Sequence, residues 1–167
     1  AMTTQTTPDL TFRNALLRSS AAPVDIGVRG GRIAAIAPSL SSKKLACEGV
    51  EIDLGGHLAL PGFVDTHIHL DKACLLGRCG HNHGSVSEAI RAVAGMKKDF
   101  TVEDVYARGA RVLERAIVHG TTRMRTHVEI DPRIGLRGFE PVKALKHDHA
   151  WAIDLELCVF PQEGLTN

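Results

Sequence analysis

Strand-like and helix-like stretches alternate in the sequence after Pro61, and this alternation limits the folds that the chain can adopt. Short apolar runs predict strands, and apolar residues at three- and four-residue spacing predict helices between them. The predicted strands are 62–70, 121–130 and 152–164, and the predicted helices are 85–98, 101–120 and 139–149. Strands that are separated by helices are typical of βαβ units, so we expect a parallel sheet.

The ends of two predicted helices carry recognisable signals. Ser85 is followed three residues later by Glu88, which is the spacing of a capping box at a helix start. Gly120 stands where the helix over 101–120 should end, and glycine readily adopts the left-handed conformation that closes many helices.

Each predicted strand has one apolar face and one face that is rich in polar groups, because residues two apart on a strand point the same way. The polar faces hold Asp65, His67 and His69, then Arg123, Arg125, His127 and Glu129, then Asp154, Glu156, Cys158, Phe160 and Gln162. The apolar faces hold Val64, Thr66 and Ile68, then Met124, Thr126, Val128 and Ile130, then Ile153, Leu155, Leu157 and Val159. An open sheet covered by helices on both sides should be apolar on both faces. We therefore favour a (β/α) barrel with a partly polar interior over a doubly wound sheet.

The first part of the chain, residues 1–60, reads as a small β-rich segment separate from the barrel part, residues 61–167. Alternating apolar residues flank Gly30 and Gly31, which is a hairpin signal. Further strand-like runs cover 9–17 and 50–62. No catalytic constellation is visible in this segment.

Composition excludes several classes of partner. The formal net charge of +1 gives no reason to expect nucleic acid or an anionic membrane surface. No apolar run is long enough for a membrane helix, and the polar N-terminus does not resemble a signal peptide. The leading Ala1-Met2 is interpreted as a remnant of tag removal. With no export signal, we expect a cytoplasmic protein with reduced thiols at Cys47, Cys74, Cys79 and Cys158.

The stretch "PGFVDTHIHLDK", residues 61–72, carries the strongest chemical signal. His67 and His69 point to the same side of a strand and lie near its carboxyl end, which is the catalytic end of a barrel. Two imidazoles placed in this way can converge on zinc, iron or nickel. The spacing alone also fits two polar strand residues without a metal.

The same stretch resembles the first-strand metal motif of the amidohydrolase superfamily, which is a Pro-Gly step, a few apolar or small residues, an acidic residue and His-x-His. "RMRTHVEI" and "DLELCVFPQEG" resemble the second and third strands of its cytosine deaminase-like branch. The resemblance implies a small N-terminal β-sandwich segment followed by the first three β/α units of a metal-dependent (β/α)8 TIM barrel.

The resemblance also implies a function and a site. His67 and His69 would be metal ligands of one divalent ion, Zn or Fe, and Gln162 would hydrogen-bond the ring amide of the substrate. The expected reaction is hydrolytic deamination of a pyrimidine-like or triazine-like ring. The expected partner is a small heterocyclic substrate, and the enzyme is expected to be a homo-oligomer.

The resemblance covers only the first part of a family member, from about residue 9 to 164. The family's third histidine, His-x-x-Glu glutamate and metal-binding aspartate come from later strands, and no His-x-x-Glu occurs in this sequence. We therefore expect a truncated chain that has no catalytic residue of its own and that pairs with the remainder of the barrel. Two alternatives stay open, namely a two-metal hydrolase of cyclic or N-substituted amides and a non-catalytic binding or assembly fragment.

Other polar residues are interpreted as structural. A zinc site at Cys74, Cys79, His81 and His83 does not have the usual spacing, although His81 or His83 can reach a substrate from this loop. We expect His127 to support the site or the core and Lys72 to be a loop residue. Glu129 and Asp131 are expected to pair with Arg125 or Arg123, His147 and His149 to lie at a solvated helix end, and Cys158 to be a packing residue.

Overall fold

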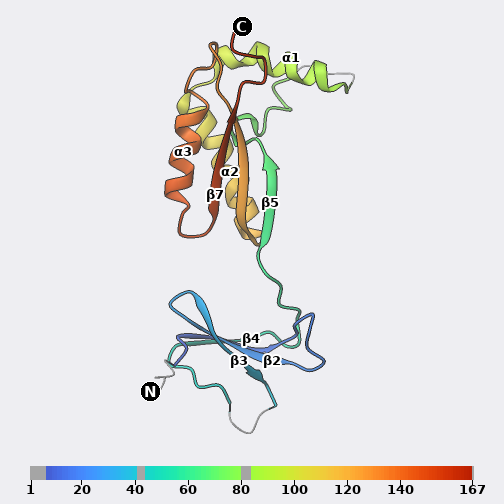
Figure 1. The fold of residues 1–167 in the computed structure, drawn as a ribbon, viewed down its shortest axis with the longest axis vertical. Coiled ribbons are helices and arrows are strands. Elements are labelled where there is room, and N and C mark those ends of the chain that lie inside the picture. Colours follow the sequence, from blue (N-terminus) through green and yellow to red (C-terminus); the bar gives the residue numbers. More distant parts are fainter. Residues whose placement is uncertain (1–6, 41–43, 80–83, 167) are drawn as a thin grey trace. The chain divides into compact units, whose positions relative to one another are not determined.

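The computed structural model describes residues 7–40, 44–79 and 84–166. The chain separates into two compact units, Ala1–Pro61 and Gly62–Asn167 (Figure 1). Among the described residues, no helix combines the length and the apolar character needed to cross a membrane. All four cysteines are free in the structure.

The described residues of the N-terminal unit form a four-stranded sheet, and the predicted sandwich stays a prediction. Its strands are β1 (Leu10–Ala15), β2 (Val24–Arg29), β3 (Arg32–Pro38) and β4 (Val50–Asp53). They lie in the order β3-β2-β1-β4, with β1 antiparallel to β2 and parallel to β4. Gly30 and Gly31, with φ angles of 55° and 74°, form the predicted hairpin turn between β2 and β3.

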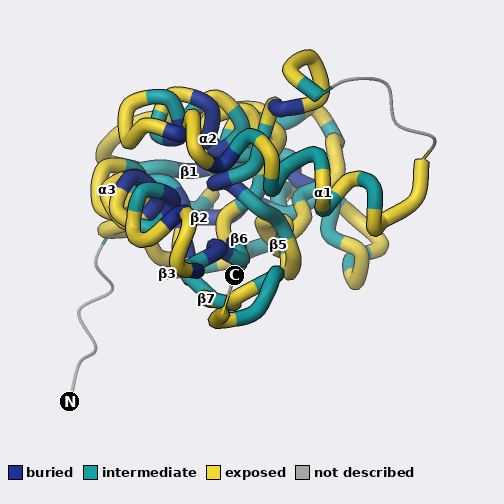
Figure 2. The backbone as a smooth tube through the Cα atoms, turned by 90° about the horizontal axis from the view of Figure 1, so that it is seen from above, coloured by how far each residue is buried: buried dark blue, intermediate teal, exposed yellow. Residues whose placement is uncertain are grey.

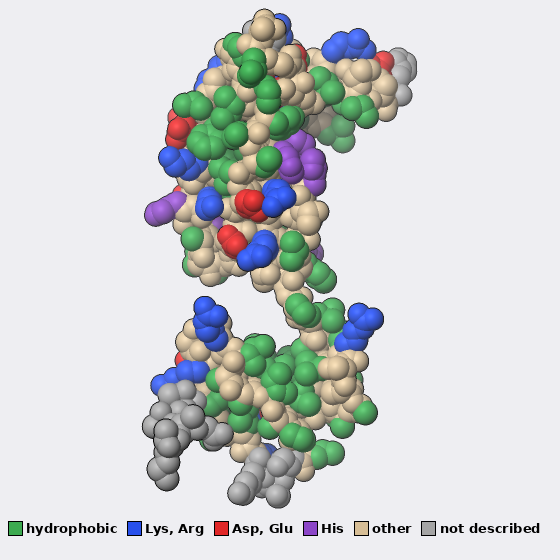
Figure 3. Space-filling model, viewed as in Figure 1, with side chains coloured by type: hydrophobic (Ala, Val, Ile, Leu, Met, Phe, Trp, Pro, Cys, Tyr) green, Lys and Arg blue, Asp and Glu red, His purple; other side chains and the backbone are tan. Residues whose placement is uncertain are grey.

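One face of this sheet is apolar and largely uncovered by the described residues. Cross-strand pairing places eight apolar side chains on it: Leu10, Phe12, Ile26, Val28, Ile33, Ile36, Val50 and Ile52. Ile26 is buried, whereas Ile33 is 67% exposed and Val50 is 60% exposed. We call this surface the apolar sheet face. A group of hydrophobic side chains is visible on this unit in Figure 3.

The opposite face of the same sheet is organised around one arginine. Arg13 forms ion pairs with Asp25 at 2.8 Å and with Glu51 at 2.5 Å. Burial alone would raise the pKa of Asp25, but hydrogen bonds from Ser39, Arg13 and the Asn14 backbone outweigh it and hold that pKa below its ordinary value. The carboxylate of Asp25 is therefore a charged, buried part of this fold.

The C-terminal unit contains the predicted three parallel strands and three helices. The elements are β5 (Phe63–Ile68), η1 (Leu70–Lys72), α1 (Val86–Met96), η2 (Lys97–Asp99), α2 (Val102–Val118), β6 (Thr121–Glu129), α3 (Phe139–Asp148) and β7 (Asp154–Phe160). The sheet order is β5-β6-β7, and both pairings are parallel. Ser85 and Glu88 form the predicted capping box of α1, and Gly120 has the positive φ of 88° expected after α2.

Helices α2 and α3 lie on one face of these three strands (Figure 1). Sequential strand order with crossovers of one hand places successive helices on the same side of a sheet. The core forms between these helices and the sheet. Its members include Leu70, Val105, Leu113, Met124, Val128, Val142, Leu145 and Leu155. Buried and exposed stretches alternate along both helices in Figure 2.

Gly109 allows α2 to approach its neighbours closely. A Cβ atom at this position would lie 2.7 Å from Leu145 Cδ1 on α3 and 3.5 Å from the backbone oxygen of Leu70. Because a carbon at 2.7 Å is inside contact distance, a side chain here would require the Leu145 side chain or the helix to move.

The predicted apolar face of β5 is only partly covered by the helices. Val64 is 59% exposed, and only Ile68 of this strand packs against the core. The reason is the position of the helices, since α2 and α3 contact β6 and β7 while β5 lies at the edge of the sheet. Val159 on the other edge strand is also exposed.

Candidate functional site

Three histidines gather on the face of the three-stranded sheet that α2 and α3 leave uncovered. His67 and His69 come from the carboxyl end of β5, and their ring centroids are 5.1 Å apart. His127 comes from β6 and stacks on His67 with a centroid distance of 4.1 Å. Figure 3 shows histidine side chains gathered on this unit beside paired acidic and basic groups.

The backbone of β6 fixes the orientation of His69. Its Nδ1 lies 2.8 Å from the carbonyl oxygen of His127. A carbonyl oxygen only accepts hydrogen bonds, so Nδ1 must carry the hydrogen and the lone pair of His69 must sit on Nε2. Burial lowers the pKa of His69, this hydrogen bond opposes the effect, and nearby Lys72 lowers the pKa further. A neutral imidazole with a free Nε2 is the form that binds a metal ion.

The donor set fits a metal bound by imidazole nitrogens, but it is incomplete within the described residues. His127 Nδ1 is buried without a hydrogen-bond partner next to the two β5 histidines. The group of three potential ligands that the described residues bring close together is Glu129, Asp131 and Glu163, not a histidine set. Catalytic zinc sites usually have three protein ligands.

Where β5 ends, side-chain oxygens accept hydrogen bonds from the backbone in place of the regular bonding between β5 and β6. The pairing of β5 with β6 shifts between Asp65 and Ile68. Beyond the shift, the Leu70 N–H donates to Thr126 Oγ1 at 3.0 Å, and the Glu129 N–H donates to Asp71 Oδ2 at 3.0 Å. Burial raises the pKa of Asp71, although this hydrogen bond and Lys72 act against the rise.

Lys72 is not a free loop residue, which corrects the prediction made for it. It ends the short η1 helix, and its Nζ lies 2.8 Å from Glu129 Oε2. The same Nζ donates a hydrogen bond to Gln162 Oε1 and lies 4.9 Å from the centre of the Phe160 ring. Lys72 therefore joins the carboxyl ends of β5, β6 and β7, where Gln162 lies just past β7.

The ion pairs predicted for Glu129 and Asp131 are also wrong, because the partner is a lysine that the sequence did not single out. Lys97 Nζ lies 2.5 Å from Glu129 Oε1 and 2.8 Å from Asp131 Oδ2, and it also pairs with Glu163. The two arginines instead bridge to β7. Arg123 pairs with Asp154 at 3.2 Å, and Arg125 pairs with Glu156 at 2.9 Å.

The remaining sequence predictions have mixed outcomes. His81 and His83 lie outside the described residues, Cys74 is exposed, and Cys158 is half-buried opposite His127. His147 is exposed as predicted. His149 is not solvated, because its ring is largely covered and its Nδ1 hydrogen-bonds the Leu145 carbonyl oxygen.

Sequence reasoning missed Lys97 and Arg108. Arg108 is buried on α2 and donates to the backbone oxygens of Asp71 and Ala73, so it holds the turn that follows the histidines. A signal for Arg108 exists, because it falls three residues after buried Val105 on the apolar stripe of α2. Nothing in the sequence distinguishes Lys97 from its exposed neighbour Lys98.

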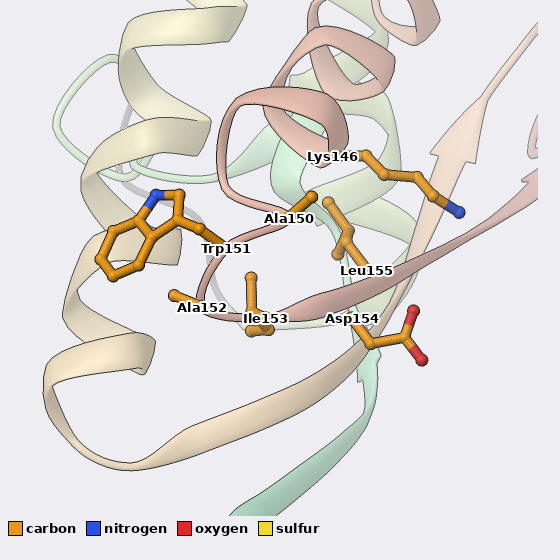
Figure 4. A pocket seen from close by; sticks show the side chains of 7 residues that line it. All are labelled: Lys146, Ala150, Trp151, Ala152, Ile153, Asp154 and Leu155. Carbon is orange, nitrogen blue, oxygen red and sulfur yellow. The ribbon is translucent and has the colours of Figure 1, made fainter. Parts of the chain in front are cut away.

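A separate cavity of about 310 Å³ lies at the amino end of β7 (Figure 4). Lys146 of α3, Trp151 of the following loop and Asp154 of β7 are among its lining residues. Trp151 is 81% exposed. Ligand sites of parallel sheets form at the carboxyl ends of strands, so this cavity lies at the wrong end of β7 to belong to the histidine site.

Comparisons with known proteins identify the family of the chain. The sequence profile of the amidohydrolase family matches residues 50–141. The chain is 31% identical to N-isopropylammelide isopropyl amidohydrolase of Pseudomonas sp. (strain ADP), over 93% of this chain and 39% of that protein. The chain therefore spans about two fifths of the length of this relative.

Two solved structures are similar in sequence as well as in fold. The first is 5-methylcytosine deaminase from Klebsiella pneumoniae liganded with 5-fluorocytosine, at 32% identity and a TM-score of 0.82, covering 92% of this chain and 37% of that one. The second is N-isopropylammelide isopropylaminohydrolase from Burkholderia multivorans ATCC 17616, at 30% identity and a TM-score of 0.75, covering 94% of this chain and 38% of that one.

Proposed function

The chain belongs to the amidohydrolase family, and we propose that it forms the first part of a metal-dependent hydrolase that deaminates a pyrimidine-like or triazine-like ring. The observation that carries this proposal is the pair of histidines at the carboxyl end of β5, with Nε2 of His69 left free by the His127 carbonyl. The names of the similar proteins support a ring-directed C–N hydrolysis.

His67 and His69 are the proposed ligands of one divalent ion, zinc or iron. Such an ion supplies an activated water at neutral pH. The chain itself contributes the orientation of its ligands: the carbonyl of His127 sets the tautomer of His69, and Arg108 and Asp71 hold the turn that follows it. Because two ligands are fewer than the three that a catalytic zinc site usually has, the proposal requires further ligands from elsewhere in the complete enzyme.

Gln162 is the proposed substrate-binding residue, and its surroundings favour one orientation. Its Oε1 accepts from Lys72, which leaves the Nε2 amide hydrogens to face a ligand. This side of the site would therefore offer donors from Gln162 and Lys72. A ring with a carbonyl oxygen or an unprotonated ring nitrogen beside the scissile C–N bond suits such donors better than a ring edge made of N–H groups.

The arrangement of the C-terminal unit supports a (β/α)8 barrel as the complete architecture. Three parallel strands in sequential order, helices on one face and a polar opposite face are the features of a barrel wall. A cytoplasmic homo-oligomer that acts on a small heterocyclic substrate completes the proposal.

Metal analysis and an ammonia-release assay test this function. The protein, in the longest form that its gene encodes, is purified and assayed on cytosine and on N-isopropylammelide. We expect His67→Ala and His69→Ala each to lose bound metal and to reduce kcat/KM at least about a thousandfold, because the activated water depends on the ion. His147→Ala, which removes an exposed histidine, is the control and should retain both properties. Full activity in a His69→Ala protein without metal would refute the proposal.

A further inference from the structure

Lys97 occupies an unusual position for a lysine. Its side chain is only 2% exposed, and it lies in η2, directly after helix α1. Three carboxylates surround its Nζ: Glu129 at the end of β6, Asp131 in the loop that follows, and Glu163 in the segment after β7. One ammonium group thus ties together three segments at the carboxyl end of the sheet.

This ammonium remains charged at neutral pH. Burial alone would lower the pKa of Lys97, but the hydrogen bonds to Asp131, Glu129 and Glu163 outweigh it and hold the pKa above its ordinary value. The three carboxylates also have the spacing of a cation site. Because Lys97 Nζ already bonds all three, the fold satisfies this acidic group with its own lysine.

Two chains of contacts lead from Lys97 to Gln162. The first passes through Glu129, whose Oε1 bonds Lys97 and whose Oε2 lies 2.8 Å from Lys72, the residue that donates to Gln162 Oε1. The second passes through Glu163, which bonds Lys97 and is the next residue after Gln162. Both the side chain and the backbone of Gln162 are therefore held relative to Lys97.

We propose that Lys97 is a positioning residue of the substrate site, which fixes the side-chain amide of Gln162 with its oxygen towards Lys72 and its NH2 group free for the substrate. This inference rests on the substrate-binding role proposed above for Gln162. The hydrogen bonds and ion pairs of Lys97 go to carboxylates and not to Gln162, so its effect is transmitted through Glu129 and Lys72 and through Glu163.

The sequence offers a direct way to observe this amide. The chain contains two glutamines, Gln5 and Gln162, so labelling with ¹⁵N-glutamine gives two side-chain NH2 signals that a Gln5→Ala variant assigns. In the 18.0 kDa wild-type chain we expect the Gln162 signal to be displaced from the position of free glutamine. The variants to compare are Lys97→Met, Glu163→Ala and, as a matched control, Lys98→Met at the exposed neighbouring lysine.

We expect the Gln162 signal to move to the free position in Lys97→Met and Glu163→Ala but to stay in place in Lys98→Met. Glu163 is 18% exposed and lies outside the core, so Glu163→Ala should fold even if Lys97→Met, which leaves Glu129 and Asp131 without their cation, does not. Arg133→Met removes the weaker 3.7 Å pair with Glu163 and controls for that loss. An unchanged Gln162 signal in folded Glu163→Ala, or a free signal in the wild type, overturns the inference.

Enzyme kinetics, measured on the longest form that the gene encodes, provide an independent test of the role of Lys97. Glu163→Ala should raise KM about tenfold, the equivalent of one well-oriented hydrogen bond, and change kcat by less than about threefold. A fall in kcat with unchanged KM would contradict a positioning role at the substrate amide. If the wild type hydrolyses no ring amine but its Gln162 amide is held as described, the proposed function fails while the positioning by Lys97 stands.

Discussion

Each unit of the molecule contains a sheet with one face that its described residues leave open, and the two open faces differ in chemistry. In the N-terminal unit the open face is the apolar sheet face, with Ile33 and Val50 largely exposed. In the C-terminal unit the open face carries histidines and the Arg–carboxylate pairs between β6 and β7. The covered faces show the opposite chemistry. The covered face of the N-terminal sheet carries Arg13 and Asp25, and the covered face of the three-stranded sheet carries the aliphatic core.

The contrast shows that a sheet face can be exposed for two different reasons. Exposed apolar area is unfavourable in water, and a continuous apolar surface usually marks a place where another layer or chain packs. Charged pairs and imidazoles tolerate water and can bind ligands. The apolar sheet face is therefore a packing surface that lacks a cover in the described residues, whereas the polar face of the three-stranded sheet has the chemistry of a site.

The largest difference in the free energy of unfolding is expected between variants of two neighbouring residues of β6 that point to opposite faces. Met124 is buried on the helix side, and Arg125 is exposed on the open side. Met124→Ala should lower the free energy of unfolding of the C-terminal unit by about 3 kcal/mol, through lost burial and a cavity. Arg125→Ala should change it by less than about 1 kcal/mol, because an exposed ion pair contributes little.

Urea unfolding followed by circular dichroism at 222 nm measures both variants, since all the α-helices among the described residues belong to the C-terminal unit. Equal losses in the free energy of unfolding for Met124→Ala and Arg125→Ala would show that the polar face of the three-stranded sheet is buried in solution. The contrast between the open faces of the two units would then be false.

A smaller, pH-dependent effect is expected on the covered face of the N-terminal sheet. The pKa of Asp25 is lower in the folded state than in the unfolded chain. Its stabilisation is therefore fully present above the unfolded value and is lost as the pH falls through the folded value. At pH 7, Asp25→Asn should cost about 1–2 kcal/mol, because Arg13, Ser39 and Asn14 lose a charged acceptor.

Urea titrations at pH 7, 5, 3 and 2, read from the Ile26 backbone amide signal, measure this difference at each pH. The difference in the free energy of unfolding between wild type and Asp25→Asn should become smaller towards the acidic end of the series. A gap that stays constant would mean that the charge of Asp25 is unimportant. Glu48→Gln, at an exposed pair with Arg29, is the control and should show almost no gap.

The smallest effect on stability tests the apolar sheet face itself. Ile36→Ser should change the free energy of unfolding by less than about 0.5 kcal/mol, because the side chain is already exposed. The same change should reduce the fluorescence of a bound apolar dye such as ANS. Leu76→Ser removes an exposed side chain outside any such face and should leave the dye signal unchanged. A loss of more than about 2 kcal/mol for Ile36→Ser would show that the face is covered in solution.

The local pattern of the sequence predicted the elements and most of their faces, because both depend on residue spacing. Met124 and Arg125 fall on opposite sides of β6 for this reason. Partners distant in the sequence were not predictable in the same way. Periodicity placed Glu129 on the open face, but Lys97 reaches it from a segment 32 residues earlier. The exposure of Val64 was missed because it depends on which strands the helices cover.

Short motifs suggest part of the candidate site, and the fold assembles the rest of it. The proposed roles of His67, His69 and Gln162 come from "THIHLDK" and "FPQEG" and stay predictions. The hydrogen bond from His69 to the His127 carbonyl and the ties from Lys72 and Lys97 join separate strands, and no spacing rule encodes them.

The close approach at Gly109 has a consequence for how tolerant the site is to change. The missing side chain leaves room for Leu145 of α3 and for the backbone of Leu70, which is the residue after His69. A single added methyl group on α2 would collide with the Leu145 side chain and would fill the space beside the backbone of Leu70. The packing around the turn that follows His69 therefore depends on a glycine of α2 outside the polar site, and a survey of variants limited to the polar residues would overlook it.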